Sequence, residues 1–134
     1  MNDHEAVYQL YTRYAAGMDN RQFELTRETF ATDASFSLNI KGTEAVAPIE
    51  GKQAVGDFIE TTTREQNDQR RHVITNVRIA QEGGADVAYA YLSLFVTDDA
   101  GLTIQCTGQY RSEVVEENGE PHFGRMHLDL DGAF

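Results

Sequence analysis

Histidine and aspartate side chains near the C-terminus alternate in a pattern that could bind a metal. His127, Asp129 and Asp131 are each separated by one residue, so a β-strand would place all three on one face. Successive side chains on one face of a strand lie about 6–7 Å apart, which is awkward for three ligands of one ion. We therefore expect a solvated strand face or a frayed terminus here, and no metal.

Two other reactive side chains, those of Cys106 and His72, have no second cysteine or histidine near them in the sequence. Cys106 is the one cysteine of the chain, and it fits a small core residue better than a nucleophile. His72 begins the stretch His72–Ala80, whose alternation predicts a strand with His72 and Asn76 on the same face. A single strand histidine is often only a hydrogen-bonded structural residue, so a catalytic role for His72 requires a partner from another part of the chain.

An imidazole acquires acid–base chemistry when a buried carboxylate lies beside it. The carboxylate fixes the tautomer and the ring orientation, and it stabilises the imidazolium that forms when histidine takes a proton. In a water-poor pocket such a pair could remove a proton α to a carbonyl and then protonate a departing hydroxyl. General acid–base help of this kind accelerates a reaction by about 10²–10⁴-fold.

The first half of the chain is predicted to be mainly helical. Five residues recur at helical spacing and should share one buried stripe: Val7, Leu10, Tyr11, Tyr14 and Met18. This helix should run from about Asp3 to Gly17 or Met18, with Asp19 and Asn20 in the turn that ends it. Further helices are predicted in residues 21–31, with Phe23 and Phe30 inward, and in residues 52–66. Between them we expect a short strand in residues 35–40 and a loop in residues 41–50.

The second half predicts strand after strand, in residues 72–80, 87–96, 102–111 and 123–130. Helices that precede a run of strands favour an α+β fold, in which a curved antiparallel sheet wraps around the helices. Residues 1–134 contain no repeat or linker, so a single domain is expected.

Composition excludes several classes of partner. Twenty-two acidic residues against eleven basic ones give a net charge of −11, which repels nucleic acid and anionic membrane surfaces. The longest apolar run, Val87–Val96, is about half of a membrane span. The single cysteine and the absence of a signal-like N-terminus predict a cytoplasmic protein. Val87–Val96 is apolar on both faces, which predicts self-association through the outer sheet surface, and the pattern does not choose between a dimer and a trimer.

Four short motifs, in this order, are similar to those of one family. They are YAAGMDNRQFE at 14–24, TFATDASF at 29–36, GKQAVGDFI at 51–59 and RHVITNVRI at 71–79. With them the whole chain resembles the SnoaL-like branch of the nuclear-transport-factor-2-like superfamily. That resemblance implies a cone-shaped cystatin-like α+β barrel that encloses a pocket.

The resemblance also implies an activity and the residues for it. Scytalone dehydratase, bile-acid dehydratase and hexachlorocyclohexane dehydrochlorinase are cofactor-free lyases that pair a histidine of this strand with an aspartate at the exit of the first helix. The matching residues here are His72 and Asp19. The same comparison assigns a catalytic role to Tyr14 and substrate binding to Arg125, and the strand alternation adds Asn76 to the pocket.

These matches predict a dehydratase without cofactor that acts on a hydrophobic cyclic molecule such as a steroid, polyketide or terpenoid. An isomerase or cyclase that abstracts the same α-proton is the alternative enzyme. A non-catalytic module, such as a transport-factor dimer or the small subunit of a ring-hydroxylating dioxygenase, is the third interpretation. Two departures bear on the substrate: Thr107–Gln109 holds no second histidine, and the chain has no tryptophan.

Overall fold

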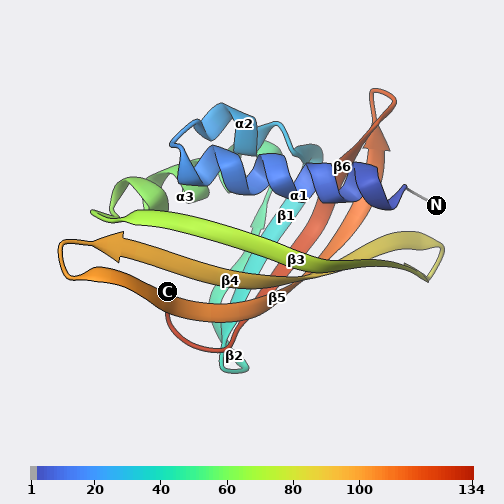
Figure 1. The fold of residues 1–134 in the computed structure, drawn as a ribbon. Coiled ribbons are helices and arrows are strands. Elements are labelled where there is room, and N and C mark those ends of the chain that lie inside the picture. The colour runs from blue at the N-terminus through green and yellow to red at the C-terminus, as the bar shows by residue number, and fades with distance from the viewer. Residues whose placement is uncertain (1–2) are drawn as a thin grey trace.

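Three helices lie on one side of a curved sheet of six strands in the computed structural model, which describes residues 3–134 (Figure 1). The helices are α1 (His4–Asp19), α2 (Phe23–Arg27) and α3 (Lys52–Arg64). The strands are β1 (Phe30–Ile40), β2 (Thr43–Glu50), β3 (Gln69–Glu82), β4 (Ala85–Asp98), β5 (Gly101–Glu117) and β6 (Glu120–Leu130). The expected α+β architecture is confirmed. No helix of the described residues is long and apolar enough to cross a membrane.

The sheet is open, with strand order β2-β1-β6-β5-β4-β3. Strands β3 to β6 form the expected antiparallel meander, and β1 pairs with β6 in parallel. Strands β2 and β3 are therefore the two edges. Helix α1 lies along the β3 side of the concave face (Figure 1), and its contacts with β3 bring the end of the helix to one edge of the sheet.

Helix α1 provides one wall of the core. Its predicted apolar stripe is confirmed, because all five residues are at most 7% exposed. Asp3 caps the helix by accepting a hydrogen bond from the Glu5 N–H, and the helix ends at Asp19. The stripe packs against inward-facing side chains of the central strands, notably Phe123 and Met126. Burial of this stripe along the whole helix therefore fixes the position of its last residue, Asp19.

A close approach between α1 and α2 fixes the helix exit further. A Cβ atom at Gly17 would lie 2.0 Å from Thr26 Oγ1, so only glycine lets the two helices pack this tightly. The Thr26 hydroxyl donates to the Tyr14 carbonyl oxygen at 2.9 Å. Gly17 and Tyr14 lie two and five residues before Asp19, so these contacts hold the end of α1 that carries Asp19.

The structure corrects two elements. The second helix ends at Arg27, and Phe30 opens β1 instead of completing that helix. Residues 43–50 form strand β2, where we expected a loop. Lys41 and Gly42 both have positive φ, as in a two-residue hairpin turn that reverses the chain onto β1. Pro48 is compatible with β2 because this strand is at the edge of the sheet.

Candidate active site

A carboxylate and an imidazole from distant parts of the chain meet where α1 ends beside β3. Asp19 Oδ1 lies 2.6 Å from His72 Nδ1, and Asp19 Oδ2 accepts the His72 backbone N–H at 2.9 Å. The side chains are 8% and 15% exposed, respectively. Because β3 is an edge strand, the carboxylate also satisfies a backbone donor that has no neighbouring strand. Asp19 is therefore held at both of its oxygens.

This geometry determines which ring nitrogen of His72 can act as a base. A carboxylate can only accept hydrogen bonds, so Nδ1 must carry the proton that it donates to Asp19. Nε2 then presents a lone pair, and it has no hydrogen-bond partner among residues 3–134. The Asp19 carboxylate would stabilise the imidazolium formed when Nε2 accepts a proton.

His72 lines a cavity between the helices and the concave face of the sheet. The cavity has a volume of about 80 Å³ and a mainly apolar wall. Apolar residues of α1, α3 and three strands contribute to it: Met18, Phe36, Ile59, Leu92, Leu94 and Leu128. Phe134 is 40% exposed and lies at its rim. Asp19 is behind His72 and does not line the cavity, so only the imidazole is presented to a ligand.

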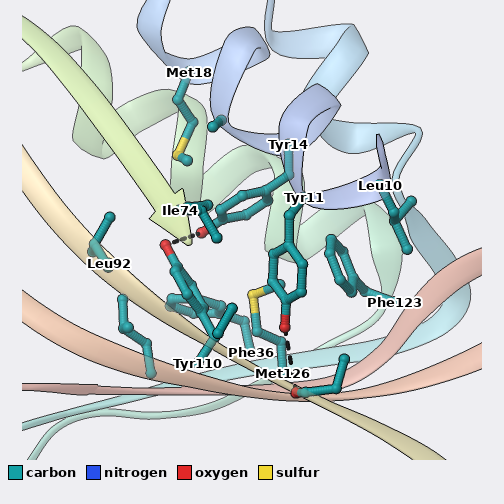
Figure 2. Packing of buried hydrophobic residues seen from close by; sticks show 14 of the residues in the cluster. Leu10, Tyr11, Tyr14, Met18, Phe36, Ile74, Leu92, Tyr110, Phe123 and Met126 are labelled. Carbon is teal, nitrogen blue, oxygen red and sulfur yellow. Dashed lines mark hydrogen bonds between the residues drawn. The ribbon is translucent and has the colours of Figure 1, made fainter. Parts of the chain in front are cut away.

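Two tyrosine hydroxyls meet in the same cavity wall. Tyr14 of α1 and Tyr110 of β5 point toward each other, with 3.2 Å between their oxygens (Figure 2). Burial raises the pKa of Tyr14 to about 12, against a weaker lowering by the hydrogen bond to Tyr110. Burial, with the neighbouring tyrosines, raises the pKa of Tyr110 well above its usual value. Both phenols therefore stay protonated and can donate hydrogen bonds.

The buried tyrosines predict a specific loss of stability in alkali. The raised pKa of Tyr14 means that the folded state holds its proton more tightly than the unfolded state does. The resulting stabilisation is complete below about pH 10, and it is lost as the pH rises toward about 12. Urea unfolding midpoints should fall over this range, and phenolate absorbance of Tyr14 should appear only together with unfolding. Ionisation of all six tyrosines in a protein that is still folded would contradict the burial.

Two predicted pocket residues lie elsewhere. Asn76 does not share the face of His72: it is exposed at φ +56°, within a bulge where the pairing of β3 with β4 shifts between Thr75 and Arg78. Arg125 is exposed on the outer face of β6 and lines a surface depression there with Glu113 and other residues. The substrate-binding roles predicted for both are therefore not supported by their positions.

The alternating residues near the C-terminus use their polar atoms in separate hydrogen bonds. His127 Nδ1 lies 2.6 Å from Ser37 Oγ, and its Nε2 lies 3.1 Å from Asp129 Oδ1. Asp131 instead accepts a hydrogen bond from the Thr107 hydroxyl. Within residues 3–134 no three histidine, cysteine or acidic side chains are grouped as metal ligands.

Cys106 is a buried residue of the core cluster, at 8% exposure. Burial raises the pKa of its thiol, which disfavours the nucleophilic thiolate. This position agrees with the core role expected for it.

Two cavity residues, Tyr110 and Arg70, were not among those predicted from the sequence. Tyr110 shares the inner face of β5 with Cys106, and the alternation in residues 102–111 was the available signal. Arg70 precedes His72 by two residues on β3, so period-two alternation places both side chains on the same face. The predicted strand began at His72, whereas β3 begins at Gln69, and Arg70 was left out for that reason.

Comparisons with known proteins agree with this fold. The family model of the SnoaL-like domain matches residues 1–127. A comparison with curated protein sequences gave no match.

Solved structures from three bacteria superpose well. ActVI-ORFA from Streptomyces coelicolor has a TM-score of 0.82 at 19% identity, over 97% of this chain and 96% of that one. An NTF2-like protein with a cystatin-like fold from Novosphingobium aromaticivorans has a TM-score of 0.82 at 19% identity, over 98% and 84%. A Catenulispora acidiphila protein in complex with S-DNPA has a TM-score of 0.79 at 24% identity, over 94% and 91%. At these identities the likeness establishes the fold alone.

Proposed function

This chain belongs to the SnoaL-like domain family, and we propose that it is a cofactor-independent lyase that eliminates water from a small cyclic hydroxyketone. The observation that carries the proposal is the Asp19–His72 hydrogen bond, which leaves Nε2 as the free nitrogen of a histidine that lines an apolar cavity. A positioned base in a water-poor site is the principal requirement of α-proton abstraction.

The proposed reaction has two proton transfers through one nitrogen atom. His72 Nε2 takes the proton from the carbon α to the carbonyl, and the C–H electrons form the enolate. The enolate then reforms the carbonyl and a C=C bond, while the β C–O bond breaks. The departing hydroxyl takes the proton from Nε2 and leaves as water, which returns the imidazole to its neutral state. Asp19 keeps Nδ1 protonated throughout.

The Tyr14–Tyr110 pair would stabilise the enolate. A phenol that stays protonated up to a pH of about 12 can donate to an oxygen on which negative charge develops. If Tyr110 donates to Tyr14, the Tyr14 hydrogen is free for the substrate oxygen. Both tyrosines line the same cavity as His72, and enolate stabilisation requires the donor and the base in one cavity.

Cavity size bears on the substrate. The volume of about 80 Å³ is well below the roughly 300–1,000 Å³ of pockets that enclose drug-sized ligands. A single-ring substrate therefore fits the proposal better than a steroid, which would require the cavity to widen past its rim at Phe134. The S-DNPA complex of the Catenulispora protein supports small-molecule binding in this fold.

Incubating the protein with a panel of cyclic β-hydroxyketones in D₂O tests the proposal. Elimination removes the mass of one water molecule, whereas the alternative isomerase would lose no water and would add the mass of the deuterium that it incorporates at carbon. Both products should require His72, so the His72→Ala variant should give neither. Product formation that is unchanged in His72→Ala would refute both enzyme readings.

We also propose that the chain self-associates through the outer face of the sheet. Four apolar side chains of β3, β4 and β5 are exposed there: Val73 (40%), Tyr91 (52%), Leu102 (66%) and Ile104 (64%). Burial of such a patch between two copies would be favourable. Sedimentation at micromolar protein should show an oligomer that Ile104→Lys shifts toward the monomer, and a monomeric wild type would contradict the proposal.

A further inference from the structure

Arg70, which lines the cavity, has a buried hydrogen-bond donor that makes no hydrogen bond. Its side chain is 14% exposed and lines the cavity two residues before His72. Arg70 Nη1 is buried, and among residues 3–134 it is the one buried side-chain nitrogen or oxygen atom without a hydrogen-bond partner. A buried donor that makes no hydrogen bond lowers stability, and a ligand in the adjoining cavity would supply the missing acceptor.

The rest of the guanidinium is already occupied. Arg70 Nε lies 3.0 Å from Asp68 Oδ1, and Nη2 lies 3.5 Å from Asp68 Oδ2. Asp68 therefore balances the positive charge of Arg70, and the Asp19 carboxylate lies behind His72 in the same region. The same region also holds Arg21, so the charges of its four ionised side chains sum to zero. An incoming carboxylate would therefore meet no excess positive charge, whereas a neutral acceptor oxygen meets an unpaired N–H donor.

We infer that Arg70 is a substrate-binding residue whose Nη1 donates to a second, neutral carbonyl oxygen of the substrate. The first oxygen is the one that the Tyr14–Tyr110 pair would bind. Side chains two apart on one strand face are about 6–7 Å apart, so the second oxygen lies away from the carbon that His72 would deprotonate. The substrate class is thus a ring with two separated neutral oxygens. This inference rests on the proposed function only in taking the cavity as the substrate site.

Three small probes test it by binding alone, through titrations followed by protein amide NMR shifts. Cyclohexane-1,4-dione carries the second carbonyl, cyclohexanone lacks it, and 4-oxocyclohexane carboxylate replaces it with an anion. Wild-type protein should bind the dione most tightly. Arg70→Met keeps the apolar stem, and it should weaken dione binding about tenfold or more while changing cyclohexanone binding less than about twofold.

A second variant separates recognition from a structural role. Asp68→Asn keeps Arg70 but removes its counter-charge, so binding of the keto-carboxylate should rise relative to the dione. Equal weakening of dione and cyclohexanone in Arg70→Met, no weakening of either, or a wild type that prefers the keto-carboxylate would overturn the inference. His72→Ala should still bind the dione more tightly than cyclohexanone, because this preference depends on Arg70. Turnover therefore tests the proposed elimination, and the binding preference tests the role of Arg70 separately.

Discussion

Replacing His72 with alanine is expected to lower turnover at least about 10²-fold while the protein stays folded. The substitution removes the proposed base, because His72 lines the cavity and its Nε2 has no hydrogen-bond partner among residues 3–134. It leaves Asp19 satisfied, since the backbone N–H of residue 72 still donates to Oδ2. Steady-state kinetics and thermal unfolding on the same preparations measure the two effects separately.

Asp19→Asn should lower turnover by a similar factor, for a different reason. Asparagine has nearly the same shape, and its oxygen can still accept the backbone N–H of His72. Its neutral amide, however, does not stabilise the imidazolium, and its NH₂ group can donate to Nδ1 and move the ring proton to Nε2. A histidine that is protonated at Nε2 cannot accept the substrate proton.

The chain offers a matched control pair. His127 and Asp129 also form an imidazole–carboxylate contact, at 3.1 Å, but they lie on β6 outside the cavity. His127→Ala and Asp129→Asn should therefore keep wild-type turnover. If the His72 and Asp19 variants also kept wild-type turnover, the Asp19–His72 pair would have no part in the chemistry.

Tyr14→Phe is expected to lower turnover by roughly 10²-fold, which corresponds to about 3 kcal/mol of transition-state stabilisation from one positioned donor. The substitution removes the hydroxyl that lies 3.2 Å from Tyr110 and keeps the ring in the core. The loss should appear mainly in kcat, because the donor acts on charge that develops only during the reaction.

Tyr11→Phe is the control for Tyr14→Phe. Tyr11 lies on the same helix, is equally buried, and donates to Ser112 Oγ at 3.0 Å, but it does not line the cavity (Figure 2). Both variants lose a buried hydroxyl together with its hydrogen bonding, so both should lose stability by about 1–3 kcal/mol. Only Tyr14→Phe should lose turnover. Equal turnover in the two variants would exclude Tyr14 as the enolate donor.

Local periodicity accounts for the part of the fold that the sequence predicted. The stripe from Val7 to Met18 has the spacing of one helix face, and the alternation in residues 102–111 has that of a strand. The contact between Asp19 and His72 could not be predicted from periodicity, because no local pattern joins residues 53 positions apart. It came from the resemblance of four motifs to the SnoaL-like family, and the structure brings the two residues into contact.

Asn76 and Arg125 do not lie on the cavity face where they were predicted. Asn76 was placed on the His72 face, but a bulge reverses the faces of β3, so that Val77 and Ile79 pack against the core instead. Arg125 was assigned by analogy, although its own neighbours Met126 and Leu128 mark the opposite face as the buried one. The strand alternation of this chain alone places Arg125 on the outer face. The exposure of Asn76 depends on its positive φ, which no hydrophobic pattern reveals.

The most direct test of the central claim is the ¹⁵N NMR spectrum of the His72 ring in wild-type protein and in Asp19→Asn. The wild type should show a protonated Nδ1 and an unprotonated Nε2, because the Asp19 carboxylate 2.6 Å away can only accept. The proton should move toward Nε2 in Asp19→Asn. A wild-type ring with its proton on Nε2 would mean that no base faces the cavity, and it would contradict the proposed elimination at its first step.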